Sequence, residues 1–210
     1  MRYFVYLFLV CFITGCHRAV FKERWIRQKA PDTFVAMFET SKGNVEVKFV
    51  REWSPLAVDR IYAQIKHGYY DHTLFYRVPP KFVAQFGADD SVRTKRWGKY
   101  KIPDEPVLKT NERGTISFAR DGKDTRGSDV FFNLRNNARL DTINFNSVKG
   151  FPVMGSVTHG MEVLDSLYSG YGDKVFSKYD TLFINKAVFL HAFPKLDSLK
   201  KAVLIRHTAK

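Results

Sequence analysis

The chain has 210 residues, of which 45% are hydrophobic and 26% charged, and 34 basic residues against 21 acidic ones give a formal net charge of +13. This length predicts one folded domain, since domains commonly run to about 100–200 residues, and the hydrophobic fraction excludes general disorder. With 13 glycines, 8 prolines and no repeat period, collagen-like and low-complexity chains are also excluded. The positive charge favours an anionic partner without choosing among nucleic acid, lipid and acidic protein.

The start of the chain has the pattern of an export signal. Arg2 precedes an apolar run over 3–13, which is shorter than the ~20 residues that a membrane-spanning helix needs. Both cysteines, Cys11 and Cys16, lie in this region, so we expect no disulfide in the body. The sequence predicts a signal peptide over 1–15, of the lipoprotein type described next. The alternatives are an ordinary signal peptide with an incidental cysteine and an uncleaved anchor.

The end of the apolar run, ITGC at 13–16, resembles the lipobox of bacterial lipoproteins, in which the cysteine is acylated and becomes the first mature residue. The resemblance implies lipidation at Cys16 and a place in the bacterial cell envelope, exported and lipid-anchored on the periplasmic or outer face. The membrane is then a partner through the anchor, and nucleic acid is not an expected partner. Residues 16–32 are basic and polar, and we expect them to form a tether.

Strand and helix patterns follow in chain order. Val- and Phe-rich runs over 34–39 and 45–50 predict a β-hairpin. Ser54, Pro55 and an apolar stripe that ends at Gly68 predict a helix with Ser54 as its N-cap. Short β-type runs are expected over 73–78, 82–87, 114–119, 130–134 and 152–157, and a second amphipathic helix is expected over 161–168. Many short strands predict a closed antiparallel sheet whose ends are covered by the two helices.

The usual catalytic and metal-binding patterns are missing from the sequence. No His, Cys, Asp or Glu spacing matches a zinc or calcium site, and no phosphate loop or nucleophile elbow occurs. The six histidines are scattered, and we expect them at the surface or at helix ends. We therefore expect neither a metal nor a cofactor. The basic and aromatic run over 95–101 is interpreted as a solvated loop.

Residues 75–87, FYRVPPKFVAQFG, resemble the FHRVIPxFxxQGG signature of the cyclophilins, a family of peptidyl-prolyl cis-trans isomerases. Further similar runs agree with the family in order and spacing: GYYD at 68–71, GTISFAR at 114–120, SDVFFNL at 128–134, LD at 140–141, MGSV at 154–157 and the strand at 200–205. The resemblance implies an all-β-dominated fold, a closed eight-stranded antiparallel β-barrel capped by two α-helices. The domain would extend over 33–210, with an added helical insertion at about 173–198 before the last strand.

The resemblance also implies a role for each matching residue. Arg77 would donate to the prolyl nitrogen as it becomes pyramidal, and Gln85 would hold the substrate carbonyl. The backbone of Arg120 would bond the residue before proline. The implied substrate-binding residues are Phe82, Val83, Arg120, Asp129, Phe131, Leu140 and Phe151.

Three residues depart from the family pattern. Arg139 replaces a Trp and Phe151 replaces a His that many eukaryotic members carry, while Asp129 replaces a Gln. The carboxylate of Asp129 is expected either to pair with Arg77 and compete for its charge, or to select substrates with basic residues near proline. We therefore hypothesise that the activity is lower than that of typical members.

The predicted function is a non-covalent peptidyl-prolyl cis-trans isomerase that acts on X-Pro bonds of envelope proteins. The X-Pro bond rotates in tens to hundreds of seconds, so a turnover of about 10 per second needs ~10³-fold acceleration, or ~4 kcal/mol. A charged hydrogen bond worth ~1.5–3 kcal/mol in a dry pocket approaches this value. The alternative is a non-catalytic module or chaperone that holds proline-containing clients in the same groove. We expect a monomer.

Overall fold

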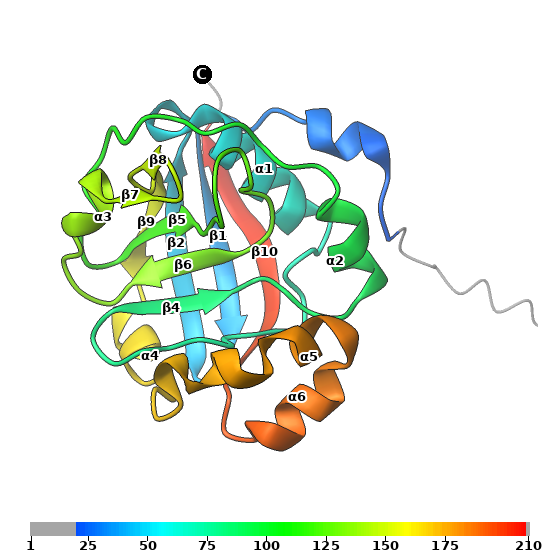
Figure 1. Cartoon of the computed structure of the whole chain (residues 1–210). Coiled ribbons are helices and arrows are strands. Elements are labelled where there is room, and N and C mark those ends of the chain that lie inside the picture. Colours follow the sequence, from blue (N-terminus) through cyan, green and yellow to red (C-terminus); the bar gives the residue numbers. More distant parts are fainter. Residues whose placement is uncertain (1–19, 209–210) are drawn as a thin grey trace, which may run out of the picture.

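An eight-stranded antiparallel sheet forms the centre of the computed structural model, which describes residues 20–208, and its strand order is β3-β10-β1-β2-β9-β5-β6-β4 (Figure 1). The strands are β1 (Thr33–Thr40), β2 (Gly43–Val50), β3 (Thr73–Leu74), β4 (Val83–Phe86), β5 (Thr115–Phe118), β6 (Val130–Asn133), β9 (Val153–His159) and β10 (Ser198–Thr208). A separate antiparallel bridge between Arg77 and Gln85 brings the chain after β3 onto β4. The two ends of the sheet therefore approach each other, and the expected barrel is confirmed. A small hairpin, β7 (Asn144–Phe145) and β8 (Val148–Lys149), lies outside the sheet.

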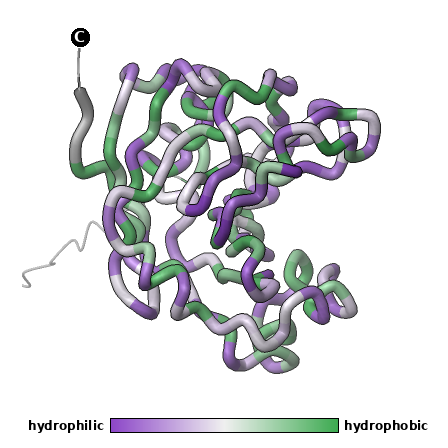
Figure 2. Tube along the Cα trace, turned by 90° about the vertical axis from the view of Figure 1, so that its left-hand side faces the viewer, coloured by the Kyte–Doolittle hydropathy of each residue, from purple (hydrophilic) through white to green (hydrophobic). Residues whose placement is uncertain are grey.

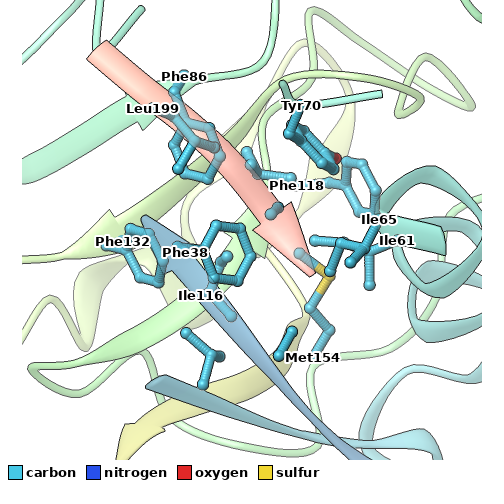
Figure 3. Packing of buried hydrophobic residues seen from close by; sticks show 14 of the residues in the cluster. Phe38, Ile61, Ile65, Tyr70, Phe86, Ile116, Phe118, Phe132, Met154 and Leu199 are labelled. Atoms are coloured by element: carbon cyan, nitrogen blue, oxygen red, sulfur yellow. The ribbon is translucent and has the colours of Figure 1, made fainter. Parts of the chain in front are cut away.

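Aromatic side chains fill the interior of the barrel. In β1, buried and half-buried positions alternate, because successive side chains of a strand point to opposite faces. Phe38 of β1 makes edge-to-face contacts with Phe86 of β4 at 5.9 Å and with Phe132 of β6 at 5.8 Å between ring centroids (Figure 3). Hydrophobic and hydrophilic residues are interleaved along the described part of the trace, as Figure 2 shows. The predicted hairpin over 34–50 is present as β1 and β2.

Helix α1 (Pro55–Lys66) covers one end of the barrel, where Ile61 and Ile65 lie near Met154 (Figure 3). The predicted helix is present, and Ser54 stands at its N-cap position, but the capping chemistry differs from the prediction. The Ser54 hydroxyl donates to Glu105 at 2.5 Å, and the Glu105 carboxylate accepts the N–H groups of Leu56 and Ala57 at 2.7 and 3.1 Å. A loop residue thus satisfies the helix start. The second predicted helix is shorter than expected, α4 (Met161–Asp165).

The remaining helices include the expected insertion before the last strand. They are α2 (Val92–Trp97), α3 (Arg139–Thr142), α5 (Tyr179–Ile184), α6 (Lys186–Ala192) and the 3-10 helices η1 (Glu23–Arg27), η2 (Arg51–Trp53) and η3 (Gly172–Lys178). Helices η3, α5 and α6 make up the insertion, with α5 and α6 side by side at the barrel end nearest β4 (Figure 1). The Asn185 side chain separates α5 from α6 and caps α6 by accepting two backbone N–H groups. Val175, Leu182 and Phe189 of the insertion are buried in a separate cluster with Leu74 and Tyr76.

The N-terminal stretch differs from the expected tether in its described part, which begins at residue 20. Trp25 of η1 is 7% exposed and stacks on His67, with ring centroids 3.8 Å apart and an angle of 7° between the planes. Phe21 packs edge-on against Trp97 at 5.3 Å. The run over 95–101 was expected to be a solvated loop, and this was wrong at Trp97, which belongs to α2 and is fully buried. Aromatic stacking therefore docks the segment on α1 and α2.

The predicted signal peptide over 1–15 and the predicted lipidation site, Cys16, lie outside the described residues. Within residues 20–208, no helix has the length and apolarity required to cross a bilayer.

Candidate active site

A mostly apolar cavity of about 390 Å³ opens between β4, β6, α3 and the insertion. It brings together eight of the nine residues assigned from the sequence: Arg77, Phe82, Val83, Gln85, Arg120, Phe131, Leu140 and Phe151. The ninth, Asp129, lines a smaller polar cavity that shares Gln85, Arg120 and Tyr179 with the first. The residues predicted from the sequence thus form one continuous site.

Strand alternation explains why the floor of this cavity is apolar. In β4, Val83 and Gln85 face the cavity, while Ala84 and Phe86 between and after them lie in the barrel core. Phe131 of β6, which pairs with Gln85, likewise faces the cavity. Val83, Phe131 and Leu140 are buried together and form a small cluster, against which Phe82, Ala119 and Phe151 pack. The floor presents rings and branched side chains with no hydrogen-bonding group, a suitable surface for an apolar ring.

Arg77 is held from several sides. Its Nη1 donates to Gln85 Oε1 at 3.1 Å, and its Nε donates to Asp173 Oδ1 at 2.7 Å. The guanidinium carbon lies 5.7 Å from the ring centroid of Phe82 and 5.2 Å from that of Phe176. Among the described residues, Nη2 makes no hydrogen bond, and the side chain is 17% exposed. A fixed cation with a free donor nitrogen, Nη2, therefore lies at the wall of an apolar groove.

Gln85 is oriented by the same contact. Its Oε1 accepts from Arg77, so its side-chain N–H₂ remains as a donor. Within residues 20–208, this amide nitrogen has no protein acceptor. It is thus available to a carbonyl oxygen placed in the groove.

Asp129 does not pair with Arg77, and this part of the sequence interpretation was wrong. Its carboxylate accepts the hydroxyl of Tyr76 at 3.1 Å and that of Ser128 at 3.3 Å. Burial raises the pKa of the Asp129 carboxyl to about 6, although both hydroxyl donors oppose this rise. The carboxylate that does pair with Arg77 belongs to Asp173, in the insertion.

Arg120 and Arg139 shape the two sides of the groove near α3. The Arg120 side chain donates to the carbonyls of Gly150 and Val148, the latter at 2.9 Å, and its guanidinium lies 4.4 Å from the centroid of the Phe151 ring. Burial lowers the pKa of Arg120. The Arg139 guanidinium lies 4.9 Å from the centroid of the Phe82 ring. These contacts fix Phe82 and Phe151, so the groove is formed before any ligand arrives.

Three residues of the insertion belong to the site and were not found from the sequence. Asp173 bonds Arg77, and Phe176 and Tyr179 line the cavity. Tyr179 also places its hydroxyl 3.4 Å from that of Tyr76. All three residues come from the insertion, where the matching family motifs end, so no spacing or motif marked them as part of the site.

The described residues, 20–208, contain no group of three or more His, Cys, Asp or Glu side chains arranged to hold a metal ion.

Comparisons with known proteins agree with the geometry of this site. Residues 34–186 match the family described as cyclophilin type peptidyl-prolyl cis-trans isomerase/CLD. Peptidyl-prolyl cis-trans isomerase A of Dickeya dadantii is 35% identical over 138 residues, which cover 62% of this chain and 69% of that protein. Peptidyl-prolyl cis-trans isomerase CYP18-1 of Arabidopsis thaliana is 31% identical over 163 residues, or 74% of this chain and 94% of the relative.

Solved structures support the same fold. A cyclophilin type isomerase of Cryptosporidium parvum superposes with a TM-score of 0.59 at 19% identity, covering 84% of this chain and 99% of that one. A structure of the same isomerase in the presence of the dipeptide Ala-Pro superposes with a TM-score of 0.56 at 19% identity, covering 81% of this chain and 98% of that one.

Proposed function

We propose that this chain, which belongs to the family of cyclophilin-type peptidyl-prolyl cis-trans isomerases, accelerates rotation about X-Pro bonds of polypeptides. The observation that carries the proposal is the position of Arg77, a fixed cation with a free Nη2 beside an apolar floor. The family membership expected from the sequence is confirmed.

The mechanism follows from the origin of the barrier. Amide resonance holds the X-Pro bond with a barrier of ~18–20 kcal/mol, and rotation localises the lone pair on the prolyl nitrogen. In our proposal, the proline ring packs on Val83, Phe131 and Leu140, and Arg77 Nη2 donates to the nitrogen as it becomes pyramidal. A charged hydrogen bond of this kind is worth ~1.5–3 kcal/mol, and exclusion of water by the floor strengthens it.

The remaining groups orient the substrate. The Gln85 amide N–H₂ would donate to a substrate carbonyl, because its oxygen is already bonded to Arg77. The backbone of Arg120, a residue of the cavity lining, would bond the residue before proline. Proline-containing polypeptides are the substrate class that we propose, and the presence of Ala-Pro in the solved structure of a related isomerase supports it.

The test is a protease-coupled assay of a tetrapeptide with a central X-Pro bond, in which the protease cleaves only the trans form. We expect the full chain, kept in solution with mild detergent, to raise the rate of the slow phase in proportion to its concentration. A slow phase equal to the thermal background at every concentration would refute the enzymatic proposal.

One observation favours a second candidate, a non-catalytic module that holds proline segments in the same groove. Arg77 Nε is already bonded to Asp173, so part of its charge is compensated before a substrate binds. This candidate predicts saturable binding of the tetrapeptide, read by chemical-shift changes, with no acceleration of its isomerisation.

For location, we propose that the chain is acylated at Cys16 and anchored in the bacterial envelope, where its clients would be envelope proteins, and that it acts as a monomer. The support is the ITGC sequence at 13–16 behind a short apolar run. In a bacterial host fed labelled palmitate, the unchanged chain should carry label in the membrane fraction, and Cys16→Ser should lose it. Equal label in both chains would contradict acylation at Cys16, and a sedimentation mass above that of one chain would contradict the monomer.

A further inference from the structure

The insertion adds a wall to the groove, and the exposed part of that wall is Phe176 of η3. Its side chain lies in the same cavity as Phe82 and Phe131, yet the residue is 49% exposed. We propose, building on the proposed isomerase function, that Phe176 contacts the substrate and selects an apolar side chain in the residue that follows proline.

Phe176 is held in position without a substrate. Its ring lies 5.2 Å from the Arg77 guanidinium carbon and meets the Tyr179 ring edge-on, with centroids 5.6 Å apart. The preceding residue, Val175, is fully buried in the cluster that joins the insertion to the barrel. Binding energy is therefore not spent on ordering the ring. A half-exposed aromatic ring at the side of an apolar cavity gains free energy when a second apolar side chain covers it.

The direction of the bound chain decides which substrate residue meets Phe176. In the proposed mechanism the prolyl nitrogen faces Arg77, and the residue before proline bonds the Arg120 backbone. The Arg120 side chain packs on Phe151, whereas Phe176 contacts Arg77. In the proposal, the chain that follows the proline ring leaves it on the Arg77 side, and there it meets Phe176.

The charge near Phe176 also limits what the wall can accept. Arg77 on one side of the ring disfavours a basic substrate side chain, and Asp173, which is exposed and bonded to Arg77, disfavours an acidic one. An uncharged apolar side chain avoids both penalties and can pack on the exposed face of the ring. This combination favours Phe or Leu after proline.

The experiment compares two tetrapeptides that differ only after proline, Ala-Ala-Pro-Phe and Ala-Ala-Pro-Gly, by exchange NMR, which needs no protease. For the unchanged full chain in mild detergent, we expect kcat/KM to be about 3- to 10-fold higher for the Phe peptide, as one aromatic contact allows. Phe176→Ala should bring the ratio near 1 by raising KM for the Phe peptide, and Phe176→Leu should keep part of the preference. Ile184→Ala, which removes a 76% exposed apolar residue of the same insertion outside the cavity, should keep the ratio.

An unchanged ratio in Phe176→Ala, or an equal loss with both peptides, would overturn the role of Phe176. A third peptide, Phe-Ala-Pro-Gly, carries its Phe before proline, and sensitivity to Phe176→Ala only in that peptide would overturn the assigned position. If the unchanged chain accelerated no peptide, the proposed function would fail by itself. Dissociation constants of the Phe and Gly peptides, measured from chemical-shift changes, would then replace kcat/KM. A ratio of the two affinities that fell in Phe176→Ala would support the role of Phe176, and an unchanged ratio would overturn it.

Discussion

Replacement of Asp129 by Asn should stabilise the protein at neutral pH and not at acid pH. Burial in the folded protein raises the pKa of this carboxyl to about 6, whereas the pKa of an Asp in an unfolded chain is about 3.9. Because the folded pKa is the higher one, folding favours the protonated form. The contribution of Asp129 to stability is therefore fully present below pH ~4 and is lost as the pH rises through ~6.

The gap between the two pKa values corresponds to at most ~3 kcal/mol in the free energy of unfolding, because Asp129 is half-buried and water screens part of its charge. In Asp129→Asn, the side-chain oxygen can still accept the Tyr76 hydroxyl, but no charge has to be buried. The variant should be more stable than the unchanged chain by up to ~3 kcal/mol at pH 7.5, and the two should differ by less than ~0.5 kcal/mol at pH 3.5.

Urea unfolding, followed by tryptophan fluorescence at pH 3.5, 5, 6 and 7.5, gives the free energy of unfolding of the unchanged chain and of Asp129→Asn. Asp180→Asn serves as the control, because Asp180 is an exposed carboxylate in the first turn of α5. It should leave the pH dependence of unfolding as in the unchanged chain. If the stability difference between Asp129→Asn and the unchanged chain stayed constant across these pH values, the argument from burial would be wrong.

Two further predictions concern the segments whose contacts the sequence did not reveal. Asp173→Ala should raise kcat about 2- to 5-fold, because it frees the Arg77 charge while Gln85 still holds Nη1. Asp173→Asn should raise kcat equally if the charge of Asp173 is the cause. A fall in kcat for both variants in the exchange NMR assay would show that Asp173 positions Arg77 instead. Trp25→Ala should lower the free energy of unfolding by about 3 kcal/mol, since Trp25 is 7% exposed and stacked on His67. A loss below ~0.5 kcal/mol in urea unfolding would show that the segment around Trp25 behaves as the tether predicted from sequence.

The centre of the site was predictable because its residues are close in sequence. Arg77 and Gln85 lie eight residues apart and meet in one antiparallel bridge. Strand alternation then places Val83 on the same face as Gln85, and the motif carries the register. In this part of the chain, residues that are close in sequence are also close in space, so a sequence motif was enough to predict the site residues.

The remaining contacts depend on distant parts of the chain. Asp173 is 96 positions from Arg77, and nothing in the insertion marks it as a partner. The competition for the Arg77 charge that we expected from Asp129 therefore falls to another carboxylate. Asp129 itself is turned toward Tyr76, a residue that the signature places beside Arg77 but whose hydroxyl direction only the folded structure defines.

The N-terminal stretch shows the same limit. Its basic residues indicated a solvated tether, but Trp25 finds a stacking partner in His67, at the end of α1 and 42 positions away. Composition indicates how an isolated segment behaves in solvent. Whether the segment docks depends on the surface residues of the folded domain, which its composition does not reveal.

The role of the Arg77 guanidinium in lowering the rotation barrier can be measured on Arg77→Ala and Arg77→Lys, with kcat and peptide affinity determined on the same samples. Arg77→Ala should lower kcat by about 10- to 100-fold, as loss of a ~1.5–3 kcal/mol charged hydrogen bond requires, and should change the dissociation constant less than ~3-fold. Arg77→Lys should restore little of the lost kcat, because an ammonium cannot keep the Gln85 contact and a free donor in the same plane. Unchanged kcat in Arg77→Ala, with peptide binding intact, would show that the Arg77 guanidinium does not lower the barrier.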